Sequence, residues 1–169
     1  MKIKIISFFT LFFTLFFSNS SFSIDSPNHL VKAKVLFNEI YDINISEGQY
    51  KVSVELLLSW DGNIDLFVKK FSDNVVHGEK LDNFLKEIWY PEFLIFNAEN
   101  PRTTHYQTLN VHDGKFQLFE RFESELSIDA DMPQYPFGNL NLNMDILAFS
   151  GNVNLMEFVP EEIIIGHNN

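Results

Sequence analysis

The side chains that could do chemistry in this 169-residue chain are mostly carboxylates: it has 23 acidic residues, five histidines and no cysteine. None of them stands in a known catalytic pattern, because the sequence has no Gly-x-Ser-x-Gly, no glycine-rich phosphate loop and no His-Glu-x-x-His. Only His105 and His112 are near each other, and such a pair is more often a surface feature than a metal site. We therefore expect no enzyme activity, no cofactor and no bound metal.

One short segment approaches a calcium-binding motif. Asp61-Gly62-Asn63-Ile64-Asp65 begins like an EF-hand loop, but Leu66 stands where that loop needs glycine and Ser72 where it needs a bidentate glutamate. We predict instead a turn with solvated acids at 61–65. The polar stretch 69–80 is predicted to be a loop.

The N-terminal residues predict export. A basic start, Met1-Lys2-Ile3-Lys4, precedes the apolar run Ile5–Phe17, and Ser21-Phe22-Ser23 fits the small-x-small rule for signal cleavage. We interpret residues 1–23 as a signal peptide and 24–169 as one exported domain, periplasmic or extracellular. An uncleaved membrane anchor is the alternative, although the run is shorter than the ~20 residues that a span needs.

The charge of the exported part limits its partners. Two of the 12 basic residues lie in the signal peptide and none of the 23 acidic ones does, so the mature chain carries a net charge of −13. This charge argues against nucleic acid and anionic lipid surfaces, and it permits a cationic ligand. Without cysteine, the domain depends on its apolar core rather than on disulfides.

The segment around the second tryptophan predicts a buried strand. Trp89 is followed by Pro91, which suits the start of a strand, and then by the unbroken apolar run Phe93–Phe96. Such a run predicts a strand buried on both faces. Asn97, which tolerates left-handed backbone angles, is the predicted stop.

Most other segments alternate apolar and polar residues, as half-buried strands do. Short turns, Ser46-Glu47-Gly48 and Asp113-Gly114, join two pairs of them as hairpins. We predict an all-β fold, an antiparallel immunoglobulin-like β-sandwich with one short helical turn at Leu81–Glu87. The further predicted strands are Leu30–Ile40, Gln49–Trp60, Tyr106–Val111, Phe116–Phe122 continuing to Ile128, Leu140–Ile146 and Asn154–Phe158.

Together these segments resemble the extracellular ligand-binding domain of the pentameric ligand-gated ion channels, the Cys-loop or neurotransmitter-gated receptor family, in its cysteine-free prokaryotic form. Trp60-Asp61 is similar to that family's tryptophan-and-acid signature. The residues Trp89, Pro91, Glu92 and Asn97 are similar to its Trp-x-Pro-Asp…Asn block, with Glu92 in place of the aspartate.

The segment from Ile128 to Leu142 is similar to the loop that two cysteines close in that family. Ile128 and Leu142 take the cysteine positions, where packing of two apolar side chains could keep the loop closed. Asp131 matches the loop's aspartate, and Tyr135-Pro136-Phe137 matches its aromatic-Pro-Phe run. We expect Trp60, Trp89, Pro91, Pro136 and Phe137 to serve packing and turns, and Asp131 to hydrogen-bond within the loop.

The resemblance implies a ligand site between neighbouring subunits. Phe96 and Phe149 match aromatic positions of the family's ligand box, and Glu55, Gln117 and Phe119 match positions on the facing subunit. Aromatic faces attract an ammonium group by about 0.5 to 2 kcal/mol each, and a carboxylate adds to that attraction. The implied ligand is a small molecule, and the Glu55 carboxylate favours a cationic one.

The resemblance does not extend to the membrane part of the family. In those receptors the sandwich continues for two more strands and then enters four membrane helices, which this sequence does not reach, so we expect no pore of its own. Its partners would be other copies in a homo-pentamer, or a separate membrane pore component. The alternatives are a non-signalling β-sandwich interaction protein, for protein or glycan contact, and a truncated receptor remnant.

Overall fold

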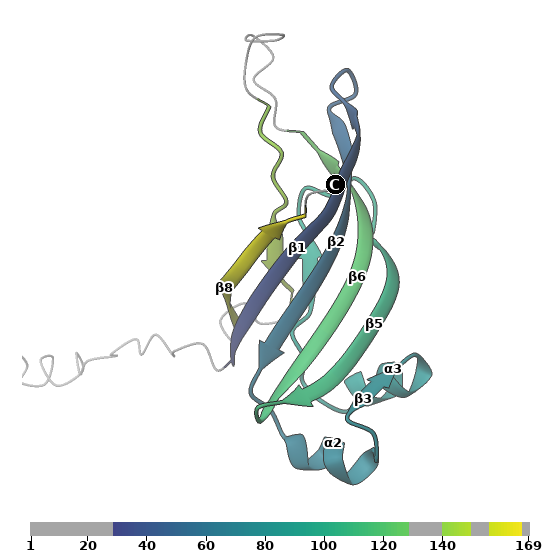
Figure 1. Cartoon of the computed structure of the whole chain (residues 1–169), viewed down its shortest axis with the longest axis vertical. Coiled ribbons are helices and arrows are strands. Elements are labelled where there is room, and N and C mark those ends of the chain that lie inside the picture. The colour runs from purple at the N-terminus through teal and green to yellow at the C-terminus, as the bar shows by residue number, and fades with distance from the viewer. Residues whose placement is uncertain (1–28, 129–139, 150–155, 167–169) are drawn as a thin grey trace, which may run out of the picture.

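The chain folds into a six-stranded sheet and a smaller two-stranded sheet that face each other (Figure 1). The computed structural model describes residues 29–128, 140–149 and 156–166. The strand orders are β3-β5-β6-β2-β1-β8 and β4-β7. In chain order the elements are β1 His29–Asn44, β2 Gln49–Trp60, α2 Ile64–Lys70, β3 Val75–His77, α3 Glu79–Leu85, β4 Phe93–Ile95, β5 Thr103–His112, β6 Lys115–Ser127, β7 Ile146–Ala148 and β8 Met156–Ile165.

Both predicted hairpins are confirmed, and with them the all-β, sandwich-like fold. β1 and β2 pair antiparallel across a turn that ends at Gly48, and β5 and β6 pair across Asp113 and Gly114. Asp113 and Gly114 have φ values of 49° and 74°, as a two-residue hairpin turn requires. The large sheet is nevertheless mixed rather than wholly antiparallel, because β8 pairs parallel with β1 after the chain has crossed through β7.

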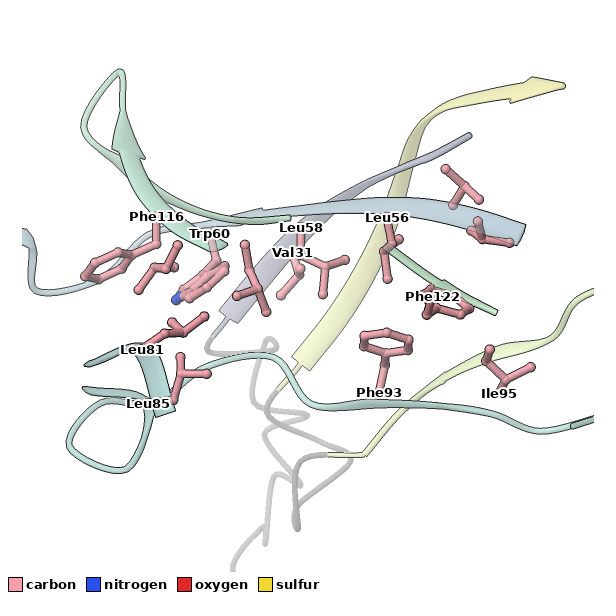
Figure 2. Close-up of a cluster of buried hydrophobic side chains, with 14 of the residues drawn as sticks. Val31, Leu56, Leu58, Trp60, Leu81, Leu85, Phe93, Ile95, Phe116 and Phe122 are labelled. Carbon is pink, nitrogen blue, oxygen red and sulfur yellow. The ribbon is translucent and has the colours of Figure 1, made fainter. Parts of the chain in front are cut away.

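The core lies between the two sheets. Every second residue of β2, from Tyr50 to Trp60, is buried, and so is every second residue of β6, from Phe116 to Leu126. From the small sheet, Phe93 and Ile95 point at this inner face (Figure 2), and the Phe93 ring centroid lies 6.1 Å from that of Phe122. Strict alternation therefore gives each sheet one apolar face and one outward face.

Two short helices close one end of the sandwich, and one of them was not predicted. α2 occupies Ile64–Lys70, where we expected a turn and a loop, and β3 lies inside the expected loop 69–80. α2 fully buries only Phe67, with Ile64 and Phe71 half-buried beside it, and its seven residues are too few for a helical period to be recognised in a window of the sequence. The helical turn expected at Leu81–Glu87 is confirmed as α3, which begins two residues earlier.

Two strand predictions also need correction. The expected strand Leu140–Ile146 is displaced: β7 covers Ile146–Ala148. The Asn97 side chain explains this shift, since its Nδ2 donates to the Asn143 carbonyl at 2.7 Å and its Oδ1 accepts from the Asp145 N–H at 3.0 Å. These bonds take backbone groups that a ladder would use. β8 runs on to Ile165, well past the expected end at Phe158.

Several predicted features lie outside the described residues. They are the signal peptide 1–23 and the loop residues Asp131, Pro136 and Phe137. Within the described ranges, no helix has the length and apolar character that crossing a membrane requires.

Candidate functional site

A cleft of about 720 Å³ lies between the segment that joins α3 to β4 and the inner face of β5 and β6. It occupies the part of the inner face that carries charged rather than apolar side chains. Its lining residues are Asp82, Leu85, Lys86, Ile88, Trp89, Tyr90, Pro91, Glu92, Phe93, Arg102, Gln107, Leu118, Glu120 and Phe149.

The floor of the cleft is built on a buried carboxylate. Glu120 takes an inward position of β6 and is 1% exposed. Arg102 binds it in a bidentate manner, Nε to Oε1 at 2.7 Å and Nη2 to Oε2 at 3.2 Å. The hydroxyl of Thr104 and the amide of Gln107 donate to the same two oxygens, at 2.7 and 3.3 Å. A buried charge persists only when it is paired and hydrogen-bonded in this way.

The Arg102 guanidinium is fixed from a second side by the small sheet. Its Cζ lies 4.0 Å from the centroid of the Phe93 ring, and its Nη1 donates to the Phe93 carbonyl at 3.3 Å. The side chain is 26% exposed, so one edge reaches the cleft. The cation therefore joins β4 to β6 across the core.

The rim of the cleft is formed where the pairing of β4 and β7 ends. The Phe149 N–H donates to the Glu92 carbonyl at 2.8 Å, which extends the register of the two strands by one pair. Burial, with the neighbouring Glu92 carboxylate adding, raises the pKa of Tyr90 to about 12. The Tyr90 phenol is consequently neutral at physiological pH.

The two predicted box aromatics lie at opposite ends of the small sheet. Phe96 donates its N–H to Asp145, whereas Phe149 donates to Glu92, so the two residues are four pairs apart, or about 13 Å. Both rings face outward, with exposed fractions of 70% and 61%. The prediction that Phe93–Phe96 is buried on both faces is wrong, because a two-stranded sheet covers the core with one face only.

The other three predicted site residues share the outward face of the large sheet. The cross-strand partner of Glu55 is Arg121, and Phe119 and Gln117 lie two and four residues before Arg121 on β6. Gln117 is therefore about 13 Å along the strand from the Glu55–Arg121 pair. The Glu55 carboxylate accepts from Arg121 Nε at 3.0 Å. Its charge is therefore already compensated within the chain.

The residues expected to serve packing sit in or against the core. Trp60 and Pro91 are buried, and Trp89 is half-buried with its ring stacked on His29 at 3.7 Å between centroids. Ile128 and Leu142 both pack against the core as half-buried residues. The loop between them lies largely outside the part of the chain that the structure describes.

Sequence reasoning missed the cleft residues Arg102, Glu120 and Tyr90. One signal was present: Glu120 interrupts the inward series Phe116, Leu118, Phe122, and a charge at an inward position predicts a buried partner. Nothing in the sequence points to Arg102 as that partner, because it precedes β5 and lies 18 residues away.

Comparison with known proteins identifies no family. No protein-family model matches the chain, and no curated protein matches it in sequence. In the described ranges, no three His, Asp or Glu side chains come together as a metal-binding group.

Proposed function

We propose that the chain is an exported ligand-binding domain of the extracellular ligand-gated ion channel type, which binds a small ligand at a subunit interface and has no pore of its own. One observation carries the proposal. Phe96 and Phe149 face outward from the small sheet, while Glu55, Gln117 and Phe119 face outward from the large sheet.

These two faces lie on opposite sides of the sandwich, so a single chain cannot bring them to one ligand. A second copy can, if its large sheet docks on the small sheet of the first. Such a contact joins two different surfaces, and repeating it with a closing rotation builds a ring. The geometry therefore supports a cyclic homo-oligomer with a ligand at each contact.

The test is the mass of the purified protein by size-exclusion chromatography with light scattering. We expect five subunits, and we expect Phe119→Lys to dissociate them because it places a charge in the contact. Val68→Lys, on the exposed side of α2, is the matched control and should leave the mass unchanged. A monomeric protein at micromolar concentration contradicts the proposal.

A monomer would favour the second candidate, a β-sandwich interaction protein. The observation behind it is the outer edge of β8, which has no partner among the described strands. Ile163 and Ile165 on this strand are 65% and 63% exposed. An edge of this kind can accept an added strand from another protein.

A further inference from the structure

We infer that the outer edge of β8 pairs with the same edge of a second copy of the chain, in an antiparallel arrangement centred on Ile164. Among the described strands, β8 is an edge of the large sheet and pairs only with β1 (Figure 1). It is ten residues long, whereas β3 at the opposite edge has three. Three consecutive isoleucines of β8, Ile163, Ile164 and Ile165, are 65%, 45% and 63% exposed. This edge is separate from the two faces of the proposed ligand contact.

The two parts of β8 differ in how they are protected from an added strand. The earlier part contains Pro160, which removes one backbone donor, and the charged residue Glu161. The Glu161 carboxylate is bound by Lys32 and Lys34 of β1, at 3.2 and 3.6 Å. The isoleucines at 163–165 carry neither a charge nor a proline. The part of the edge that can accept a strand is therefore short and apolar.

The pairing of β8 with β1 directs the backbone groups of Ile163 and Ile165 away from β1. The Gly166 N–H donates to the Phe37 carbonyl at 2.8 Å, and Phe37 is the cross-strand partner of Ile165. In a regular parallel ladder, Gly166 and Ile164 then turn their backbone groups towards β1. Because the direction alternates along a strand, the N–H and C=O groups of Ile163 and Ile165 point out of the sheet edge.

These directions select one register for self-pairing. When Ile164 faces Ile164 of the second copy, Ile163 of each copy lies opposite Ile165 of the other. Each of those pairs can then exchange both of its N–H···O=C bonds. The Ile164 pair is of the non-hydrogen-bonded kind, with its Cα atoms about 4.5 Å apart. A centre at Ile163 would instead place Glu161 and Glu162 opposite isoleucines, which loses the apolar match.

The side chains next to the edge extend the apolar surface. Val35 and Phe37 of β1 are the cross-strand partners of Ile163 and Ile165, so these four side chains lie on one face. Pairing two copies makes this apolar surface continuous across the contact and removes the isoleucines from water. The edge is thus its own complement, as a two-fold contact between identical chains requires.

Cysteine variants can report this register. The contact is short and joins two chains of net charge −11, so we expect a weak association that salt strengthens. Disulfide trapping detects such contacts, and the chain has no cysteine of its own. With Ile164→Cys, two cysteines meet across the two-fold axis within the Cα separation of about 4.4 to 6.8 Å that a disulfide needs. With Ile163→Cys, they are diagonal neighbours about 8 Å apart, which is too far.

The experiment is air oxidation of the purified full chain carrying Ile164→Cys, Ile163→Cys or Val68→Cys, followed by non-reducing electrophoresis. We expect Ile164→Cys to form a linked dimer at least tenfold faster than the other two variants. Val68 is 64% exposed on α2 and measures linkage by chance collision. A mixture of Ile163→Cys and Ile165→Cys chains should link faster than either variant alone, because these positions lie opposite each other.

A backbone variant tests whether main-chain bonds make the contact. Adding Ile165→Pro to Ile164→Cys removes an N–H that points away from β1, so β8 should stay in the sheet while linkage slows at least tenfold. Circular dichroism confirms that each variant is folded. Equal linkage rates for Ile164→Cys, Ile163→Cys and Val68→Cys overturn the inference and leave the edge to a strand of another protein. Fastest linkage for Ile163→Cys alone also overturns it, because it requires another register.

The test is independent of the proposed ring. Phe119→Lys, which should dissociate the ring, should leave the linkage of Ile164→Cys unchanged. Fast linkage in a protein that forms no ring upholds the edge contact and contradicts the proposed function. A five-subunit protein in which Ile164→Cys links no faster than Val68→Cys does the opposite.

Discussion

Phe116 and Glu120 both lie buried on the inner face of β6, but among different kinds of neighbour. Phe116 is at the end of the strand near the helices, and Glu120 is in its middle. Phe116 is surrounded by rings, with centroids 5.6 Å from Trp60, 6.1 Å from Phe67 and 6.3 Å from Phe84. Four residues along the same face, Glu120 is equally buried but is surrounded by hydrogen-bond donors. Close packing of aromatic rings stabilises the region around Phe116, whereas hydrogen bonds to a paired charge stabilise the region around Glu120.

The difference explains where the cleft lies. Ring packing under α2 and α3 is non-directional and fills its space, so it leaves no room for a ligand. The Arg102–Glu120 pair is directional, and each group keeps its place because the other is present. A binding site requires a fixed polar floor beside unfilled space. The ring cluster of Trp60, Phe67, Phe84 and Phe116 can only stabilise the fold.

The largest expected effect comes from breaking the polar region. Arg102→Ala leaves the Glu120 carboxylate buried without its cation, and we expect it to lower the free energy of unfolding by about 3 to 5 kcal/mol. Urea denaturation followed by circular dichroism measures this loss.

Replacing the whole pair provides the control for that variant. The double variant Arg102→Met with Glu120→Met removes both charges and restores apolar packing, so it should recover most of the loss. If Arg102→Ala costs less than about 1 kcal/mol, the central region is not held by charge and the comparison with Phe116 fails.

A smaller effect is expected where one side chain combines both kinds of burial. Tyr50 packs its ring in the core and donates its hydroxyl to the Asn143 carbonyl, and burial raises its pKa to about 12. The neutral phenol is therefore favoured in the folded state, and its contribution is complete below pH 10. We expect stability to fall as pH rises from 10 to 12, by up to about 3 kcal/mol from Tyr50.

Urea denaturation at a series of alkaline pH values tests this, with Tyr50→Phe as the comparison. The variant should be less stable near neutral pH, because it leaves the Asn143 carbonyl without the hydroxyl, but it should lose less between pH 10 and 12. Tyr106→Phe alters an exposed tyrosine and should follow the parent curve. An unchanged alkaline loss in Tyr50→Phe would rule out Tyr50 as its source.

The sequence predicted the strands that have a repeating pattern or a characteristic turn. It did not predict the position of a strand that depends on a single side-chain contact. Strict alternation placed β2 correctly, and the Asp113-Gly114 turn placed the β5–β6 hairpin, because period and turn chemistry are local. The position of β7 depends on the Asn97 side chain, 46 residues from Asn143. No local pattern reports a contact of that kind.

The candidate site was predictable only in part for the same reason. Phe149 was identified as a site residue, and it lies on the rim of the cleft. Glu92 was noticed as a motif position but was not assigned to a ligand. Its closeness to Phe149 follows from the β4–β7 register, which pairs residues 57 positions apart. The Arg102–Glu120 floor depends on a segment outside any strand, whose path the sequence does not show.

The smallest expected effect tests whether the ring cluster is as tightly filled as the comparison requires. At Gly62, an added Cβ would lie 2.7 Å from two carbons of the Phe116 ring. We expect Gly62→Ala to lower the free energy of unfolding by about 1 to 2 kcal/mol, since the ring has no free volume to move into. Urea denaturation measures this as well.

A double-mutant cycle identifies the source of that loss. In a Phe116→Val background the two ring carbons are gone, so adding Gly62→Ala should cost almost nothing further. A loss that persists in this background would place the strain in the backbone at Gly62 instead. If Gly62→Ala is neutral on its own, the ring cluster must contain space, and the cleft beside Glu120 would no longer be the distinctive void of the inner face.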